Sequence, residues 1–186
     1  YKEQSIIDAR EKAITKDGVE IKVNANIDIP EETESLLKYG IDSIVLYRTE
    51  FLYIFSDINE NENSVFPSEE VQFRVYKNIV SKMRGRVVIR TLDIGGDKMS
   101  PALGLTDFKK EDNPFLGWRA IRFCLSNKNV FKEQLKALLR ASAFGDIETL
   151  FPMISVLEEF SETKKFIEEI KLELKNENVE FNENIK

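Results

Sequence analysis

The chain has 186 residues, a length typical of one domain with a sizeable core. Hydrophobic residues make up 42% and charged residues 32%, which excludes a disordered tail. The chain has no run of 18 apolar residues that could cross a membrane. The net charge of −6 has the wrong sign for nucleic-acid binding, and the absence of histidine excludes a Ser-His-Asp triad and histidine metal ligands. With a single cysteine and no signal peptide, we expect a soluble protein of a reducing cytoplasm.

Apolar periodicity divides the chain into alternating helices and strands. Helical patterns cover residues 2–13, 31–40, 68–83 and 129–144, and a last helix presents Phe160, Ile167, Ile170 and Leu174 on one face. Strand patterns cover residues 19–27, 43–47, 86–90 and 147–153. This order predicts an α/β protein of parallel (β/α) units. Four units are half of a TIM-type (β/α)₈ barrel, which needs about 250 residues.

The two ends of the chain suggest a segment of a longer protein. The sequence begins with Tyr1 instead of methionine, and its last residues, 177–186, follow a helical pattern with a polar composition. We expect this polar stretch to lead into a fifth strand.

Two predicted strands end in the same short motif. Arg48 and Arg90 each follow an apolar strand and precede a threonine. An acidic residue comes soon after in both cases, Glu50 and Asp93. Ligands bind at the carboxyl ends of parallel strands, and two guanidinium groups there suit an anion with phosphate and carboxylate groups. The alternative is that both arginines are structural ion-pair residues whose partners are these acids.

The loop after the second motif reads Asp-Ile-Gly-Gly-Asp-Lys over residues 93–98. Its paired glycines permit a close backbone approach, and Lys98 offers a point charge to a phosphate, although an ordinary turn is the favoured interpretation. The missing Gly-Lys-Ser/Thr ending excludes a P-loop. Glu50, Asp93 and Asp97 are ligands of the type that Mg²⁺ prefers, but we favour a role in orienting the arginines.

A later segment, residues 113–122, holds the only tryptophan beside two arginines. Arg119 is a candidate for a third cation over the pocket. The alternative is that Trp118 anchors the loop and that Arg119 and Arg122 form ion pairs. Cys124 follows in an apolar helical context, which predicts an inert core residue instead of a low-pKa nucleophile.

Six segments, in order and across nearly the whole chain, resemble the phosphoenolpyruvate-protein phosphotransferases, enzyme I of the bacterial sugar phosphotransferase system. They are residues 23–27, 46–52, 66–72, 90–98, 113–122 and 151–153. Pyruvate phosphate dikinases and phosphoenolpyruvate synthases share the Arg-Thr-Glu motif, but the sequences of residues 94–98 and 115–122 favour enzyme I.

The resemblance implies a fold and a set of site residues. Residues 1–16 would be a linker helix, and residues 17–186 would be the first half of the phosphoenolpyruvate-binding (β/α)₈ domain. Arg48 and Arg90 match the arginines that hold the phosphate of phosphoenolpyruvate, and Arg119 matches a further arginine near the pocket. The family's Mg²⁺ ligands and its proton-donating cysteine come from later strands, so no catalytic or metal-binding residue is expected in this chain.

The resemblance also implies a reaction and partners. The full-length enzyme would transfer the phosphoryl group of phosphoenolpyruvate to a histidine of its own N-terminal domain and then to the carrier HPr, the first step of sugar uptake. We expect a homodimer, with Mg²⁺ as cofactor and without nucleic acid or membrane insertion, and an inactive segment when isolated. The alternatives are a dikinase-type or synthase-type phosphoenolpyruvate-binding domain and a non-catalytic dimerisation module.

Overall fold

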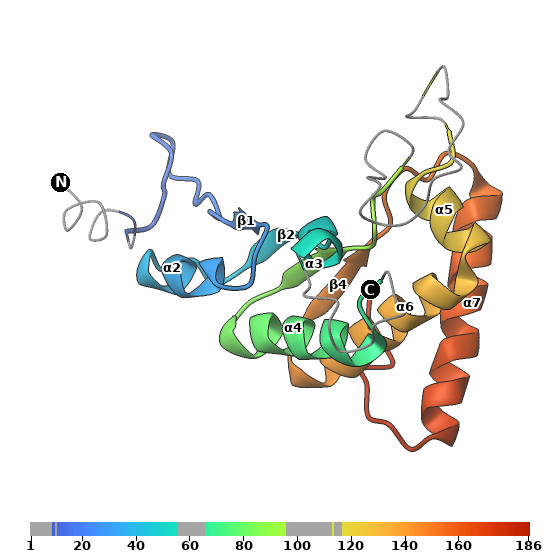
Figure 1. Cartoon of the computed structure of the whole chain (residues 1–186). Helices are drawn as coiled ribbons and strands as arrows, with labels where there is room; N and C mark the ends of the chain where they lie inside the picture. The colour runs from blue at the N-terminus through green and yellow to red at the C-terminus, as the bar shows by residue number, and fades with distance from the viewer. Residues whose placement is uncertain (1–8, 10, 56–65, 96–112, 114–116) are drawn as a thin grey trace.

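The protein is described from a computed structural model that covers residues 9, 11–55, 66–95, 113 and 117–186. Four parallel strands form one sheet in the order β1-β2-β3-β4, with helices between them (Figure 1). The strands are β1 (Ala25–Ile27), β2 (Ile44–Arg48), β3 (Val87–Arg90) and β4 (Ile147–Leu150). The helices are α2 (Glu32–Lys38), α3 (Glu50–Phe55), α4 (Glu69–Lys82), α5 (Ala120–Ser126), α6 (Lys128–Ala141) and α7 (Leu157–Asn176). The predicted parallel α/β class is therefore confirmed, as a sheet consistent with half of a barrel.

Local sequence signals account for where two of the helices, α4 and α7, begin. The side chain of Ser68 accepts a hydrogen bond from the backbone N–H of Val71 and caps α4, as its sequence pattern predicts. At the start of α7, the carboxylate of Glu159 accepts hydrogen bonds from the backbone N–H groups of Ser155 and Val156. These bonds satisfy donors that the first turn of a helix leaves free.

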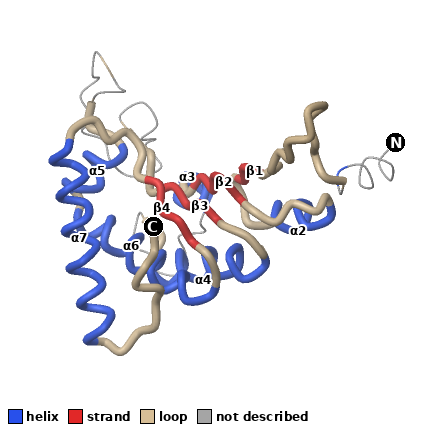
Figure 2. Tube along the Cα trace, turned by 180° about the vertical axis from the view of Figure 1, so that it is seen from behind, coloured by secondary structure: helices blue, strands red, loops and turns tan. Residues whose placement is uncertain are grey.

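The core lies between the sheet and one helical layer. In both views, α2, α4 and α6 run along the same side of the sheet, and α7 packs outside α6 (Figures 1 and 2). Strand residues Tyr47, Ile89 and Ile147 are almost completely buried, as are Ile79 of α4 and Leu138 of α6. Burial of these apolar side chains is the main favourable contribution to folding.

The first predicted strand is shorter than its sequence pattern indicates. Only Ala25–Ile27 pairs with β2, whereas Ile14 and Glu20 form an antiparallel bridge around a turn at Gly18. Val19, Ile21 and Val23 alternate as in a strand, yet their side chains are 53%, 50% and 61% exposed. Residues 19–21 therefore belong to a local hairpin, and the prediction of one continuous strand over 19–27 is wrong. The predicted linker helix over 1–16 lies largely outside the described residues.

Two further differences concern helices. The helix α3 begins directly after the first arginine motif, where no helix is predicted from the sequence. On α7, Ile170 and Leu174 are buried as predicted, but Phe160 is 42% exposed. In the part of the chain that the structure describes, no helix is long and apolar enough to span a membrane.

The stretch after α7 returns to the sheet. The backbone N–H of Thr149 in β4 donates a hydrogen bond of 2.7 Å to the carbonyl oxygen of Lys186. Residue 186 thus lies beside β4, whose other edge pairs with β3. This position is the one that a fifth strand would take, in agreement with the expected role of residues 177–186.

Candidate functional site

The two arginines that end strands are neighbours in the sheet. Arg48 and Arg90 are the last residues of β2 and β3, and they are paired across the two strands. Paired residues of adjacent parallel strands project to the same face, so both side chains start from one edge and one face. The repeated motif therefore brings two guanidinium groups to the carboxyl end of the sheet.

Two buried carboxylates hold Arg90. Its Nη2 lies 2.7 Å from Oε1 of Glu50, and its Nη1 lies 3.2 Å from Oδ2 of Asp93. The backbone N–H of Asp93 donates a further bond of 3.1 Å to the same Glu50 oxygen. Within the described part of the chain, Nε of Arg90 and Oε2 of Glu50 are buried and form no hydrogen bond. The ion-pair interpretation is correct here, and it leaves one donor and one acceptor open at the site.

Arg119 joins this cluster through Asp93. Its Nη2 and Nε lie 2.9 and 3.3 Å from Oδ1 of Asp93, and its side chain is 4% exposed. An antiparallel bridge to Gly95 and a bond from the N–H of Ala120 to the carbonyl of Ile94 bring Arg119 here. A Cβ at Gly95 would lie 2.3 Å from Cβ of Arg119, so only glycine permits this contact without displacement.

The sequence predicts that the glycine pair allows a close backbone approach, and the structure shows this for the first glycine of the pair. Gly95 lets the segment after β3 contact Arg119. Residues 96–98 of that motif, which include Asp97 and Lys98, lie outside the described residues.

Arg48 is the most accessible of the three arginines. Its Nη1 lies 2.8 Å from Oδ1 of Asp28, which follows β1, and the two side chains are 40% and 35% exposed. The structure therefore joins Arg90 and Arg119 through one carboxylate and places Arg48 beside them on the next strand. Sequence reasoning missed Asp28, since nothing in its local sequence indicates a partner 20 residues later.

The charges at this edge balance in pairs. Each candidate arginine contacts at least one carboxylate: Asp28 for Arg48, Glu50 for Arg90 and Asp93 for Arg119. Burial raises the pKa of the Glu50 carboxyl, and the adjacent Asp93 carboxylate adds to this rise, while Arg90 acts in the opposite direction. Fixed carboxylates orient the guanidinium groups before a ligand arrives, a prerequisite for electrostatic stabilisation without reorganisation.

The same contacts test the metal-binding alternative. Glu50 and Asp93 both bind arginine side chains, as the favoured interpretation predicts. Among the described residues, no group of three His, Cys, Asp or Glu side chains could hold a metal ion. In the described part of the chain, the contacts of Glu50 and Asp93 are therefore those of carboxylates that orient arginine side chains.

The neighbouring segment has structural contacts. Nε1 of Trp118 donates a 3.0 Å bond to Ser126, and its ring packs edge-on against Phe123 at 5.1 Å between centroids. Nη1 of Arg122 lies 3.3 Å from Oε1 of Glu159 on α7. These contacts support the anchoring interpretation for Trp118.

Cys124 is a core residue. Its side chain is 1% exposed, and burial raises the pKa of its thiol far above the ordinary value. A thiol that stays protonated is a poor nucleophile, as its apolar sequence context predicts.

Sequence reasoning also missed Gln134 of α6, which contacts both arginine-bearing segments. It is 1% exposed and bonds with Leu92 and Thr49. The available signal was a polar residue on the apolar helix face that Phe131, Leu135 and Leu138 form.

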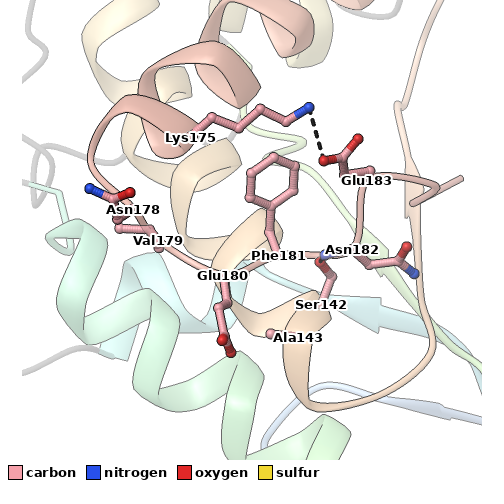
Figure 3. A pocket seen from close by; sticks show the side chains of 9 residues that line it. All are labelled: Ser142, Ala143, Lys175, Asn178, Val179, Glu180, Phe181, Asn182 and Glu183. Carbon is pink, nitrogen blue, oxygen red and sulfur yellow. Dashed lines mark hydrogen bonds and ion pairs between the residues drawn. The ribbon is translucent and has the colours of Figure 1, made fainter.

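A hollow elsewhere on the surface is separate from this site. Residues after α6 and after α7 line it, including Ser142 and Phe181, and an ion pair of 2.9 Å between Lys175 and Glu183 spans one side (Figure 3). Because Ser142 precedes β4 in the chain, the hollow lies near the amino ends of the strands, away from the arginines. Ligand sites of parallel α/β folds lie at the opposite ends.

Comparisons with known proteins identify the family of this chain. A family model described as "PEP-utilising enzyme, PEP-binding domain" matches residues 2–186. The chain is 46% identical to the phosphoenolpyruvate-protein phosphotransferases of Mycoplasma capricolum and Listeria monocytogenes, over 94% of this chain and 29% of each relative. It is also 46% identical to that of Bacillus subtilis, over 88% of this chain and 27% of the relative. The chain thus spans less than a third of these proteins, and it belongs to the family of PEP-utilising enzymes, in the region of their PEP-binding domain.

Proposed function

We propose that the carboxyl edge of β2 and β3 binds the phosphate group of phosphoenolpyruvate. Arg48 and Arg90 are its contacts, and Arg119 stands next to them. The observation that carries this proposal is the pairing of Arg48 with Arg90 at the last position of adjacent strands. Guanidinium groups recognise phosphate and carboxylate oxygens bidentately, and phosphoenolpyruvate carries both groups.

The proposal extends to a full-length protein of the kind that the relatives represent. The P–O bond of phosphoenolpyruvate breaks as a P–N bond to a histidine forms, and the released enolate takes up a proton to give pyruvate. The phosphoryl group then passes to HPr. The acceptor histidine lies outside this chain, which contains none. Such a transfer needs charge neutralisation and alignment, and two fixed guanidinium groups supply both.

The cofactor belongs to the same proposal. We expect Mg²⁺ to be held by residues outside this chain, where it would neutralise charge on the phosphate oxygens. The homodimer, the cytoplasmic location and the inactivity of the isolated segment stay predictions.

The decisive experiment compares Arg90→Ala, Arg90→Lys and Arg86→Ala in the full-length protein that contains this chain. A hydrogen bond to a charged group contributes about 1.5–3 kcal/mol, so Arg90→Ala is expected to weaken phosphoenolpyruvate-dependent phosphorylation by about 10-fold to 100-fold. Lysine is expected to restore little, because an ammonium group cannot reproduce the planar fork.

Arg86→Ala is the matched control. Arg86 precedes β3 at the opposite end of the same strand, and its Nη1 lies 3.1 Å from Oε2 of Glu148. Its removal should leave phosphoenolpyruvate turnover near that of the unchanged protein. Near-normal turnover of a folded Arg90→Ala protein, checked by circular dichroism, would contradict the proposed role of Arg90.

A further inference from the structure

A buried side chain of α6 bonds to both arginine-bearing segments. Gln134 lies on α6, on the helical side of the sheet, and is 1% exposed. Its Oε1 accepts a 3.0 Å hydrogen bond from the backbone N–H of Leu92. Its Nε2 donates a 3.3 Å bond to Oγ1 of Thr49.

These two partners adjoin the arginines. Thr49 directly follows Arg48, and Leu92 lies between Arg90 and Asp93. The hydroxyl of Thr49 itself donates a 2.9 Å bond to the carbonyl oxygen of Arg90. Gln134 and Thr49 therefore clamp the carboxyl ends of β2 and β3 together from behind the site.

The orientation of the amide follows from its partners. The N–H of Leu92 can only donate, so it requires the oxygen of Gln134. The Thr49 hydroxyl uses its proton on the carbonyl of Arg90, so it accepts from the amide nitrogen. The second N–H of Gln134 is used by Tyr76, at 3.3 Å to its hydroxyl oxygen. Every polar atom of this buried amide is thus satisfied, and an apolar side chain of the same length would leave the Leu92 N–H without its partner.

We propose that Gln134 is a positioning residue for the phosphate-binding arginines: without touching the ligand, it fixes the spacing of the Arg48 and Arg90 segments. This inference rests on the proposed function. Misplacement of a binding group by about 1 Å can reduce turnover about 100-fold, so the clamp is a determinant of activity as well as of packing.

The test uses the full-length protein that contains this chain and four single variants. Gln134→Met keeps the length of the side chain and removes its hydrogen bonds. Thr49→Val removes the bridging hydroxyl at constant shape, whereas Thr49→Ser retains it. Ser142→Ala is the matched control, because Ser142 is also buried and hydrogen-bonded, but it lies after α6 near the amino ends of the strands (Figure 3).

Gln134→Met and Thr49→Val are each expected to lower kcat/KM for phosphoenolpyruvate by about 10-fold or more, with a higher KM. Thr49→Ser should restore it to within about three-fold. The kcat/KM of the Gln134→Met/Thr49→Val double variant should be no lower than that of the less active single variant, because both changes break the same clamp. Transfer to HPr from already phosphorylated protein, which does not involve phosphoenolpyruvate, should be unchanged.

Ser142→Ala should lower the melting temperature about as much as Gln134→Met while kcat/KM for phosphoenolpyruvate stays unchanged. A folded Gln134→Met protein with unaltered kinetics would overturn the inference. An equal loss of kcat/KM in Ser142→Ala and Gln134→Met would overturn it as well. If Gln134→Met does not fold, equal activity of Thr49→Val and Thr49→Ser overturns it. Failure of the unchanged protein to bind phosphoenolpyruvate is a different outcome, which refutes the proposed function itself.

Discussion

Replacement of Asp93 by alanine probes the carboxylate on which the site is built. Asp93 is 5% exposed and contacts Arg119 at 2.9 Å and Arg90 at 3.2 Å. Its removal leaves Arg119, whose side chain is 4% exposed, without this carboxylate in a poorly solvated place. Arg90 keeps Glu50 as a partner. The damage should therefore come mainly from the lost contact of Asp93 with the buried Arg119 side chain.

The magnitude follows from burial. Removing one partner of a buried ion pair costs about 3–5 kcal/mol, because the other charge stays desolvated. A domain of this size has a free energy of unfolding of about 5–15 kcal/mol, so the loss is a large share of the total. Asp93→Asn retains an oxygen that can accept a hydrogen bond from Arg119. Its free energy of unfolding should therefore lie between those of the unchanged chain and Asp93→Ala.

Urea unfolding followed by far-ultraviolet circular dichroism measures this free energy. Asp28→Ala is the control, since the pair of Asp28 with Arg48 is 35–40% exposed and contributes about 0–1 kcal/mol. Both variants remove one carboxylate that contacts an arginine of the same edge. An Asp93→Ala protein that is destabilised no more than Asp28→Ala would refute the view that buried ion pairs hold this site.

Three further outcomes are expected. Burial raises the pKa of folded Glu50, so the contribution of this residue to stability is fully present below its ordinary pKa of 4.5 and is lost as pH rises through the higher folded value. In Glu50→Gln the free energy of unfolding should therefore fall less with rising pH. Urea unfolding at several pH values that shows the same pH dependence as the unchanged chain would contradict this prediction. The thiol of Cys124 should stay unreactive toward a thiol reagent until urea unfolds the chain, and rapid labelling of the native chain would show that it is accessible. Gly95→Ala should cost about 1–3 kcal/mol, because its Cβ would lie 2.3 Å from that of Arg119, and an unchanged urea midpoint would mean that the two segments are not in contact.

Local patterns were sufficient for the order of the four strands and for the position of two candidate arginines. Apolar periodicity reports which side chains are buried, and the alternation of periods predicts parallel (β/α) units. Arg48 and Arg90 could be located because a residue that ends a parallel strand must lie at the carboxyl edge. The same reliance on period failed at residues 19–24, where the alternating apolar side chains are exposed and residues 19–21 belong to a hairpin.

The partners of the charges and polar groups depended on the fold. Glu50 and Asp93 were correctly expected near the arginines because they are close in sequence, although their contacts with Arg90 and Arg119 join residues up to 40 positions apart. Gln134 is 85 residues from Thr49, and on its helix it reads as one polar residue among apolar ones.

The sequence by itself thus determined the parallel class and the edge at which the arginines gather, since both follow from short-range periodicity and strand direction. Only the tertiary structure decided that Asp93 joins Arg90 to Arg119, that Asp28 holds Arg48 and that Gln134 ties the two strand ends. The physical reason is that a buried polar group must find a partner wherever the packed chain supplies one, and no local pattern encodes that distance.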